Sequence, residues 1–242
     1  MTGPPRVSRV LVVTAVPAER DAVLRALGPP DRTGSPDRTG APVFEVLAAG
    51  VGPAAAAAAT AGELTAAALR GEPYGLVVSA GIGGGFAPAA PPGAAVVASR
   101  IIAADLGAGS PDGFLDVAEL GFGRAAHQPP ERLARAVADA SGAVHAPVLT
   151  VSTVTGTAER AAELAARHPG AAAEAMEGFG VAEAAARGGL PVLEIRTVSN
   201  AVGPRDRAAW RIPEALRALT GTCGRIRPVL DSWSADHDAE HA

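Results

Sequence analysis

The sequence predicts an α/β protein with three layers, α/β/α, around a central mixed, mainly parallel sheet. Short runs of Val, Leu and Ile alternate along the chain with longer helical segments, as expected for βαβ units. The predicted strands are apolar throughout, which is typical of strands covered on both faces. Since no linker-like stretch divides the 242 residues, we predict one domain over residues 1–242, with a polar tail at about 232–242.

The N-terminal half contains four predicted strands and two predicted helices. Strands are expected at 7–13, 43–49, 76–80 and 94–104, and helices at 17–27 and from 53 to about 70. Pro17 supports the first helix because proline is favoured at the first helical positions. The segment 29–42 contains PDRTG twice, and it is predicted to be an exposed loop because two copies are too few for a repeat fold.

The C-terminal half is predicted to hold two strands and four helices. Strands are expected at 148–152 and 191–198, and helices at about 130–140, 157–167, 175–188 and 208–230. Residues 105–129 are predicted to be loop. Ligands of parallel sheets bind beyond the carboxyl ends of the strands, so polar residues at those ends are the first candidates for a site.

Composition and charge exclude several classes of function. The formal net charge of −4 offers no basic surface for nucleic acid. The apolar stretch 54–59 is too short to cross a bilayer. The first residues lack a charged region followed by an apolar core and a cleavage site, so we do not expect export. A single cysteine, Cys223, fits a reducing compartment, so we expect a cytoplasmic protein without membrane contact. The five histidines show no metal-ligand spacing, and we expect neither a metal nor a cofactor.

Two acidic residues are candidates for a site. Glu19 lies in the first turn of the helix that follows the first strand, and is either a solvated acid favoured by the helix dipole or a catalytic residue. Glu177 lies at a helix start among apolar neighbours. It is either an ordinary helix-start residue or a partner for a sugar diol, since one carboxylate can accept two hydrogen bonds.

Two further stretches leave alternatives open. GIGGG, residues 81–85, cannot be a dinucleotide fingerprint, because Phe86 replaces the last glycine and a proline-rich segment follows. It is either a tight turn or a loop whose bare backbone approaches a ligand. PRDR, residues 204–207, is either a solvated charge cluster or an anion clamp.

Asn200, the only asparagine of a chain without lysine, is predicted to follow the last core strand, where asparagine is usually a turn residue.

Five collinear segments resemble the purine nucleoside phosphorylase and nucleosidase superfamily over roughly residues 7–220. VVTAVPAE, AAGVGPAAAA, VVSAGIGGGFAP, AMEGFGVAEAA and EIRTVSNAVG look like segments of the bacterial methylthioadenosine/adenosylhomocysteine nucleosidases. The chain departs from that pattern at Asn200, where those nucleosidases have Asp, at Ile82, which replaces a serine, and at Pro17-Ala18, which replaces two acids. Asn200, together with the VGPRDRAAW that follows it at residues 202–210, makes the chain most similar to the futalosine hydrolase family.

The resemblance implies hydrolysis of futalosine to hypoxanthine and dehypoxanthine futalosine in menaquinone biosynthesis. Glu19 matches the residue that orients or deprotonates water, and Glu177 matches the residue that holds the ribose hydroxyls. A carboxylate at the nucleophile position argues against phosphorolysis, because it would repel phosphate. We expect a small nucleoside as the ligand and, from the assembly of the relatives, a homo-oligomer that is a dimer or larger.

Asn200 gains a chemical role in this interpretation. Hypoxanthine protonated at N7 offers a donor at N7 and an acceptor at O6, and the Asn amide offers the matching acceptor and donor. Adenine protonated at N7 offers two donors, which suit a carboxylate. Because Asn cannot supply the proton itself, the proton would come from water while Asn200 stabilises the departing base.

The remaining predicted site residues come from the matching segments. They are Met176, Phe179, Gly81, Ile82, Gly83, Gly156 and Thr157. Arg205 or Arg207 is expected to pair with the carboxylate of the substrate's 5′ extension, and Phe86, Phe122 or Trp210 to line its aromatic end. Three alternatives stay open: a 6-oxopurine nucleoside phosphorylase, an adenine-type nucleosidase, and a nucleoside-binding module without activity.

Overall fold

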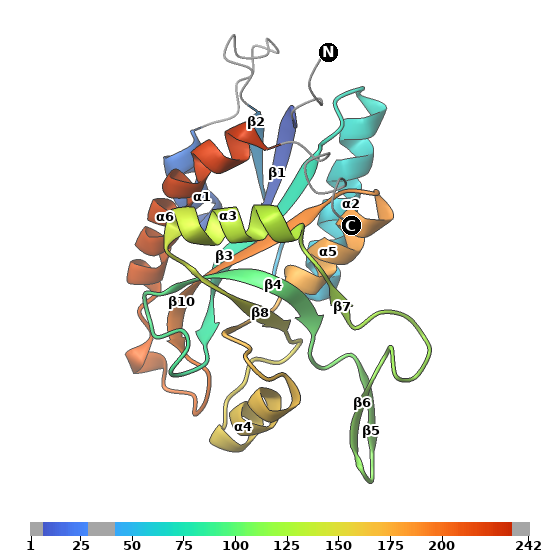
Figure 1. Ribbon diagram of the computed structural model, residues 1–242, viewed down its shortest axis with the longest axis vertical. Coiled ribbons are helices and arrows are strands. Elements are labelled where there is room, and N and C mark those ends of the chain that lie inside the picture. The colour runs from blue at the N-terminus through green and yellow to red at the C-terminus, as the bar shows by residue number, and fades with distance from the viewer. Residues whose placement is uncertain (1–6, 29–41, 234–242) are drawn as a thin grey trace.

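The computed structural model describes residues 7–28 and 42–233 (Figure 1). Its centre is an eight-stranded sheet in the order β10-β4-β8-β9-β3-β1-β2, with β7 paired to β4. The strands are β1 (Arg9–Thr14), β2 (Val43–Ala48), β3 (Leu76–Gly85), β4 (Ala95–Ala103), β7 (Ala126–His127), β8 (Val144–Thr150), β9 (Ala173–Ala175) and β10 (Val192–Ala201).

The sheet is mixed and mainly parallel, as the sequence predicts. Five pairings are parallel: β1–β2, β1–β3, β3–β10, β4–β8 and β8–β9. The pairs β4–β10, β3–β9 and β4–β7 are antiparallel. Because β10 pairs with both β3 and β4, the pairings β10-β4-β8-β9-β3-β10 form a closed circuit, which the sequence did not predict.

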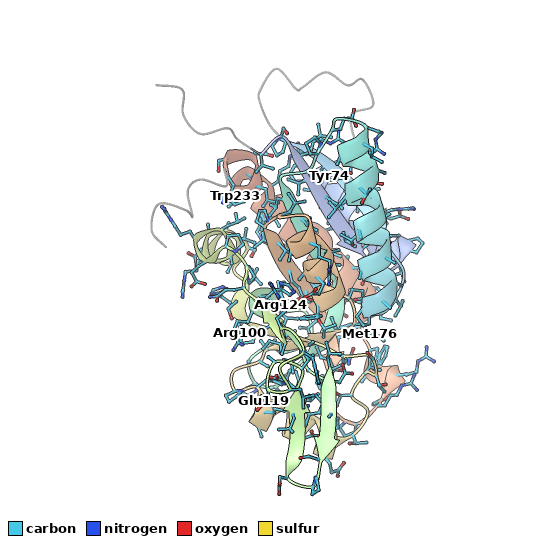
Figure 2. All side chains as sticks on the ribbon, turned by 90° about the vertical axis from the view of Figure 1, so that its right-hand side faces the viewer. Tyr74, Arg100, Glu119, Arg124, Met176 and Trp233 are labelled. Atoms are coloured by element: carbon cyan, nitrogen blue, oxygen red, sulfur yellow. The ribbon has the colours of Figure 1, made fainter. Side chains whose placement is uncertain are left out.

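Helices cover both faces of the sheet. They are α1 (Pro17–Leu27), α2 (Pro53–Leu69), α3 (Glu131–Ser141), α5 (Gly178–Arg187) and α6 (Ile212–Ser232), whereas α4 (Ala158–Arg167) packs through Leu164 in a third apolar cluster. One apolar cluster joins α1, α3 and α6 to the sheet, and a second joins α2 and α5 to its other face. Figure 2 looks onto α2 and α5, which lie side by side. The predicted three-layer fold class is therefore confirmed.

Strand β1 shows how the sequence produces two buried faces. Val10 and Val12 belong to the cluster with α1, α3 and α6, whereas Leu11 and Val13 belong to the cluster with α2 and α5. Successive side chains of a strand point to opposite faces, so an uninterrupted apolar run fills both layers. Among the described residues, no helix is both long and apolar enough to cross a membrane.

The structure differs from the sequence prediction at several elements. The GIGGG stretch is not a turn or loop but the second half of β3, and Asn200 lies within β10 rather than after it. The predicted helix at 175–188 begins only at Gly178, because β9 occupies Ala173–Ala175. The predicted loop 105–129 contains a hairpin, β5 (Gly107–Ser110) and β6 (Gly113–Asp116), which projects from the body (Figure 1). The PDRTG repeats and the polar tail from residue 234 onward lie outside the described residues.

Candidate active site

A cavity of about 380 Å³ opens at the carboxyl ends of β1, β3, β9 and β10. This is the edge where parallel sheets bind their ligands. Most of its lining comes from these strand ends and the loops that follow them: Ala15, Val16, Glu19, Val51, Ile82, Gly83, Gly84, Val154, Thr155, Glu174, Ala175, Met176, Glu177, Ser199, Asn200, Ala201, Val202, Gly203, Pro204, Arg205 and Trp210. The two predicted acids and the predicted amide therefore share one cavity.

Glu19 is buried and held by backbone donors. Its Oε2 accepts hydrogen bonds from the N–H groups of Ala15 at 2.9 Å and Val16 at 3.2 Å, and its Oε1 accepts one from Ile82 at 2.9 Å. A carboxylate offers about four acceptor positions, so one position on Oε1 stays available. Since Glu19 lines the cavity, that position can orient a water molecule.

Glu177 is also buried and lies immediately before α5. Its Oε1 accepts a hydrogen bond from the N–H of Gly52, and its Oε2 accepts one from Nη1 of Arg196, each at 3.2 Å. Each oxygen has about two acceptor positions, so one remains on each. Two vicinal hydroxyls can donate to these two positions.

Arg196 connects the acids beneath the cavity, which it does not line. The side chain is 1% exposed, and its Nε donates to Oε1 of Glu194 and its Nη2 to Oγ of Ser79, each at 2.9 Å. Burial opposes the charge of the guanidinium, but the carboxylates of Glu194, Glu177 and Glu19 outweigh burial and raise the pKa of Arg196. Arg196 thus stays positively charged among three acids.

Asn200 reaches the cavity from an irregular part of β10. The register of β10 against β3 shifts between Val198 and Asn200, so Ser199 is the extra residue of a β-bulge, a feature that re-aims neighbouring side chains. The Ser199 hydroxyl donates to Oδ1 of Asn200 at 2.8 Å, and Nδ2 of Asn200 donates to the Ala201 carbonyl at 3.0 Å. Each end of the amide keeps one further bonding position, so the side chain is oriented and still able to bind.

The glycines of β3 allow these side chains to approach the strand. A Cβ added at Gly81 would lie 2.7 Å from Oε1 of Glu19 and 2.8 Å from Nη1 of Arg196, and one added at Gly83 would lie 2.6 Å from the Glu174 carbonyl. Real Cβ contacts essentially never fall below 3.0 Å. The glycine stretch is therefore required by the close approach of neighbouring protein atoms to a strand, which is neither the tight turn nor the ligand-contacting loop that its sequence left open.

The other predicted residues divide into two groups. Met176, Ile82, Gly83, Arg205 and Trp210 line the cavity. Met176 lies near the N-terminal ends of α2 and α5 (Figure 2). Gly81, Gly156, Thr157 and Phe179 do not line it.

Gly156, Thr157 and Phe179 each have another structural role. The Thr157 hydroxyl caps α4 by accepting from the N–H of Arg160 at 3.1 Å, and the Gly156 carbonyl accepts from the N–H of Arg205. Phe179 packs against His127 and lines a separate cavity of about 510 Å³ together with the exposed Phe122. Phe86 is buried in an apolar cluster, and Arg207 lies over the Trp210 ring.

Sequence reasoning did not select Glu174, Thr155 or the buried Arg196 as site residues. Glu174 and Thr155 both line the cavity, and Thr155 binds Glu174 through its N–H at 2.8 Å and through its hydroxyl. Burial raises the pKa of the Glu174 carboxyl, against the hydrogen bonds from Thr155. The signal for Arg196 was present in the sequence, since Glu194 and Arg196 are charged residues within an apolar strand.

The site combines a carboxylate that can orient water, a carboxylate that can hold a diol, and an amide that can bind two adjacent polar atoms. Within residues 7–28 and 42–233, no group of three or more His, Cys, Asp or Glu side chains is placed to hold a metal ion. The arrangement suits the cleavage of a glycosidic bond by water, with charge stabilised by side chains.

Comparison with known proteins identifies the class. Residues 38–228 match the family model described as the phosphorylase superfamily. The fold is shared with the methylthioadenosine/S-adenosylhomocysteine nucleosidase of Neisseria meningitidis, solved in complex with methylthio-immucillin-A. That structure has a TM-score of 0.73 at 18% identity, over 93% of this chain and all of the other.

More similar sequences narrow the class to a family. The chain is 64% identical to futalosine hydrolase of Streptomyces coelicolor over 93% of this chain and 97% of the relative. It is 49% identical to futalosine hydrolase of Acidothermus cellulolyticus over 86% of both chains. The chain therefore belongs to the phosphorylase superfamily and, within it, to the futalosine hydrolase family.

Proposed function

We propose that this chain hydrolyses the N-glycosidic bond of futalosine, giving hypoxanthine and dehypoxanthine futalosine for menaquinone biosynthesis. The observation that carries the proposal is the convergence of Glu19, Glu177 and Asn200 on one cavity. The 64% identity to the futalosine hydrolase of Streptomyces coelicolor supports the choice of substrate.

Glu177 binds the ribose in this proposal. Its two remaining acceptor positions, one on each oxygen, receive the 2′- and 3′-hydroxyls, while Gly52 and Arg196 hold the carboxylate from behind. Glycosidic cleavage develops positive charge on the sugar. A carboxylate fixed beside that charge stabilises the transition state more than the ground state.

Glu19 directs the water. Its three backbone hydrogen bonds fix the carboxylate and leave Oε1 with one acceptor position for a water aimed at C1′. The same negative charge disfavours a phosphate dianion at that place. Arg205 is the one arginine among the residues that line the cavity, so the described cavity has little to hold phosphate.

Asn200 binds the departing base. Its Oδ1 accepts from N7–H and its Nδ2 donates to O6, in addition to the bonds that orient the amide. A 6-oxo base satisfies both ends, whereas a 6-amino base sets a donor against a donor. Arg205 and Trp210, at the rim formed by residues 203–210, contact the carboxylate and the aromatic part of the 5′ extension.

We also propose a cytoplasmic homo-oligomer of single-domain subunits. The support for oligomerisation is a set of apolar side chains left on the surface near β5 and β6: Leu106 is 46%, Leu115 39% and Phe122 83% exposed. Exposed apolar patches often mark contacts between proteins. Sedimentation of the purified chain at the monomer value would contradict the oligomer.

The test is hypoxanthine or adenine release from futalosine, inosine and methylthioadenosine in phosphate-free buffer. We expect futalosine to give the highest kcat/KM, and Glu19→Ala and Glu177→Ala to reduce it at least a hundredfold, on the order of the loss of an acid–base group or a fixed charge. Glu45→Gln, at an ion pair with Arg9 outside the cavity, is the control and should retain activity. Preferred cleavage of methylthioadenosine by the wild type would contradict the proposal.

A further inference from the structure

The buried carboxylate of Glu194 has no role in the mechanism above, yet it lies beside the ion pair of Arg196 and Glu177. Glu194 and Arg196 are 0% and 1% exposed, and they are two residues apart on β10, so their side chains leave the same face of the strand. Oε1 of Glu194 accepts from Nε of Arg196 at 2.9 Å. Glu194 therefore holds the inner edge of the guanidinium whose outer nitrogen Nη1 holds Glu177 at 3.2 Å.

The second oxygen of Glu194 has no hydrogen-bond partner among the described residues. Oε2 is buried, and burial raises the pKa of the carboxyl. A buried acceptor without a partner destabilises a fold. The pair of Glu194 and Arg196 is thus a poor choice for stability alone, since apolar side chains of similar volume at both positions would serve the core as well or better, whereas removing Glu194 alone would leave a buried charge.

The neighbouring backbone makes room for this carboxylate. A Cβ added at Gly178 would lie 2.2 Å from Oε1 and 2.3 Å from Oε2 of Glu194. Gly178 is the first residue of α5 and follows Glu177 directly. The carboxylate therefore lies against the N-terminus of the helix that presents Glu177, where the helix dipole favours negative charge.

We infer that Glu194 is a positioning residue that sets the orientation and charge balance of Arg196 and, through it, the carboxylate of Glu177. This inference rests on the proposed function for the reaction that it affects. With Glu194 in place, the single charge of Arg196 is shared among several carboxylates. Glu177 is then held in position but keeps its negative character toward the sugar. Without the charge of Glu194, Arg196 is left to Glu177 and Glu19, and it neutralises the carboxylate that the transition state needs.

The test is kinetic and uses Glu194→Gln, which keeps the shape and removes the charge. We expect kcat on futalosine to fall about ten- to a hundredfold, the range of couplings within one ion-pair network, with KM changed less than about threefold, because the hydroxyl contacts of the ground state remain. Gly178→Ala, which displaces the same carboxylate, should lower kcat in the same way. Glu45→Gln, another carboxylate-to-amide change in an ion pair, should change neither constant.

A double variant separates positioning from a general effect on the fold. If Glu194 acts through Glu177, Glu194→Gln lowers kcat less than about threefold in a Glu177→Gln background, because coupled residues are not additive. The inference would be overturned if the double variant lost kcat by the product of the two single losses. It would also be overturned if Glu194→Gln had the kcat of the wild type. The acid limb of the pH–rate profile should also change in Glu194→Gln, since the carboxyl that faces Arg196, Glu177 and, farther away, Glu19 no longer titrates.

Failure of the Glu194 inference can be distinguished from failure of the proposed function. If the wild type cleaves another nucleoside and not futalosine, the futalosine proposal fails and the coupling is measured with that nucleoside. If it cleaves none, NMR of the Arg196 Nε–H gives the answer, because a buried hydrogen-bonded proton exchanges slowly with water. We expect faster exchange in Glu194→Gln than in Glu45→Gln, and equal exchange in both would overturn the inference.

Discussion

At the scale of single residues, Asn200 carries the choice of base. The bulge at Ser199 turns the amide toward the cavity, and the Ala201 carbonyl, which can only accept, fixes Nδ2 on its side. An amide presents one acceptor and one donor, whereas a carboxylate presents only acceptors. The difference between Asn and Asp at this position is therefore a difference between 6-oxo and 6-amino purines.

Asn200→Asp should shift the preference from 6-oxopurine toward 6-aminopurine nucleosides. A mismatched buried polar contact costs about 1–3 kcal/mol, so the ratio of kcat/KM for inosine to that for methylthioadenosine should fall about ten- to a hundredfold. Asn200→Ala is the control: it removes both the match to the 6-oxo base and the mismatch to the 6-amino base, so it should lower the ratio less than Asn200→Asp does. An unchanged ratio in Asn200→Asp would remove the role assigned to this residue.

Glu19, Glu177 and Asn200 could be selected from the sequence because each is polar next to an apolar element and matches a family segment. Their approach to one cavity required the fold. Glu174 was not selected, because nothing in its local sequence shows that it binds Thr155, which is 19 residues away in the chain. Thr157 was selected from the alignment of segments, but its hydroxyl caps α4, a use that a threonine before a helix often has.

At the scale of elements, the glycine stretch was the main error. Glycine is depleted in strands and common in turns, so GIGGG favoured a turn after a short strand. In the structure β3 continues through Gly85, paired with β9 and β10. The side chains and carbonyls that pack against it leave no space for a Cβ, and this long-range crowding is invisible in the local sequence.

The crossing of α2 and α5 depends on another glycine. A Cβ at Gly180 would lie 2.1 Å from the carbonyl oxygen of Pro53, so the two helix starts meet backbone against backbone. Gly180→Ala should lower the free energy of unfolding by about 1–3 kcal/mol through overpacking. In Gly62→Ala, where the added Cβ meets nothing within 4 Å, the free energy should rise by up to about 1 kcal/mol from helix propensity.

Urea unfolding of the two variants compares these effects directly. A stable Gly180→Ala variant would mean that α2 and α5 are free to move apart. Because Gly180 follows Glu177 by three residues, we also expect that variant to lose activity at temperatures where it stays folded.

At the scale of the whole molecule, the layered fold could be predicted, whereas the closed circuit of strands could not. Long apolar runs and their spacing were enough to place the other parallel strands and the helices. The three-residue strand β9 and the additional pairing of β10 with β3 close the circuit. Both depend on contacts between segments far apart in the chain, which a local pattern does not record.

The pH dependence of stability should include a contribution from His127. Burial lowers the pKa of His127 and outweighs its hydrogen bond to Glu183, while Arg124 adds repulsion. The unfolded chain therefore takes up this proton first as the pH falls below about 6.5, and folding stability is lost from there down to the folded pKa. In His127→Gln the free energy of unfolding, measured by urea at about pH 7.5 and pH 5.5, should fall less than in the wild type. An equal fall would contradict this contribution.

Hydrolysis rather than phosphorolysis of futalosine is the central claim, and its most direct measurement is the rate of hypoxanthine release at increasing phosphate concentration. The negative carboxylate of Glu19 lies at the water position, and the described residues include no phosphate site. We therefore predict full activity without phosphate, and no sugar phosphate among the products at any phosphate concentration. A rate that vanishes without phosphate and rises with it, together with a sugar phosphate product, would contradict the account.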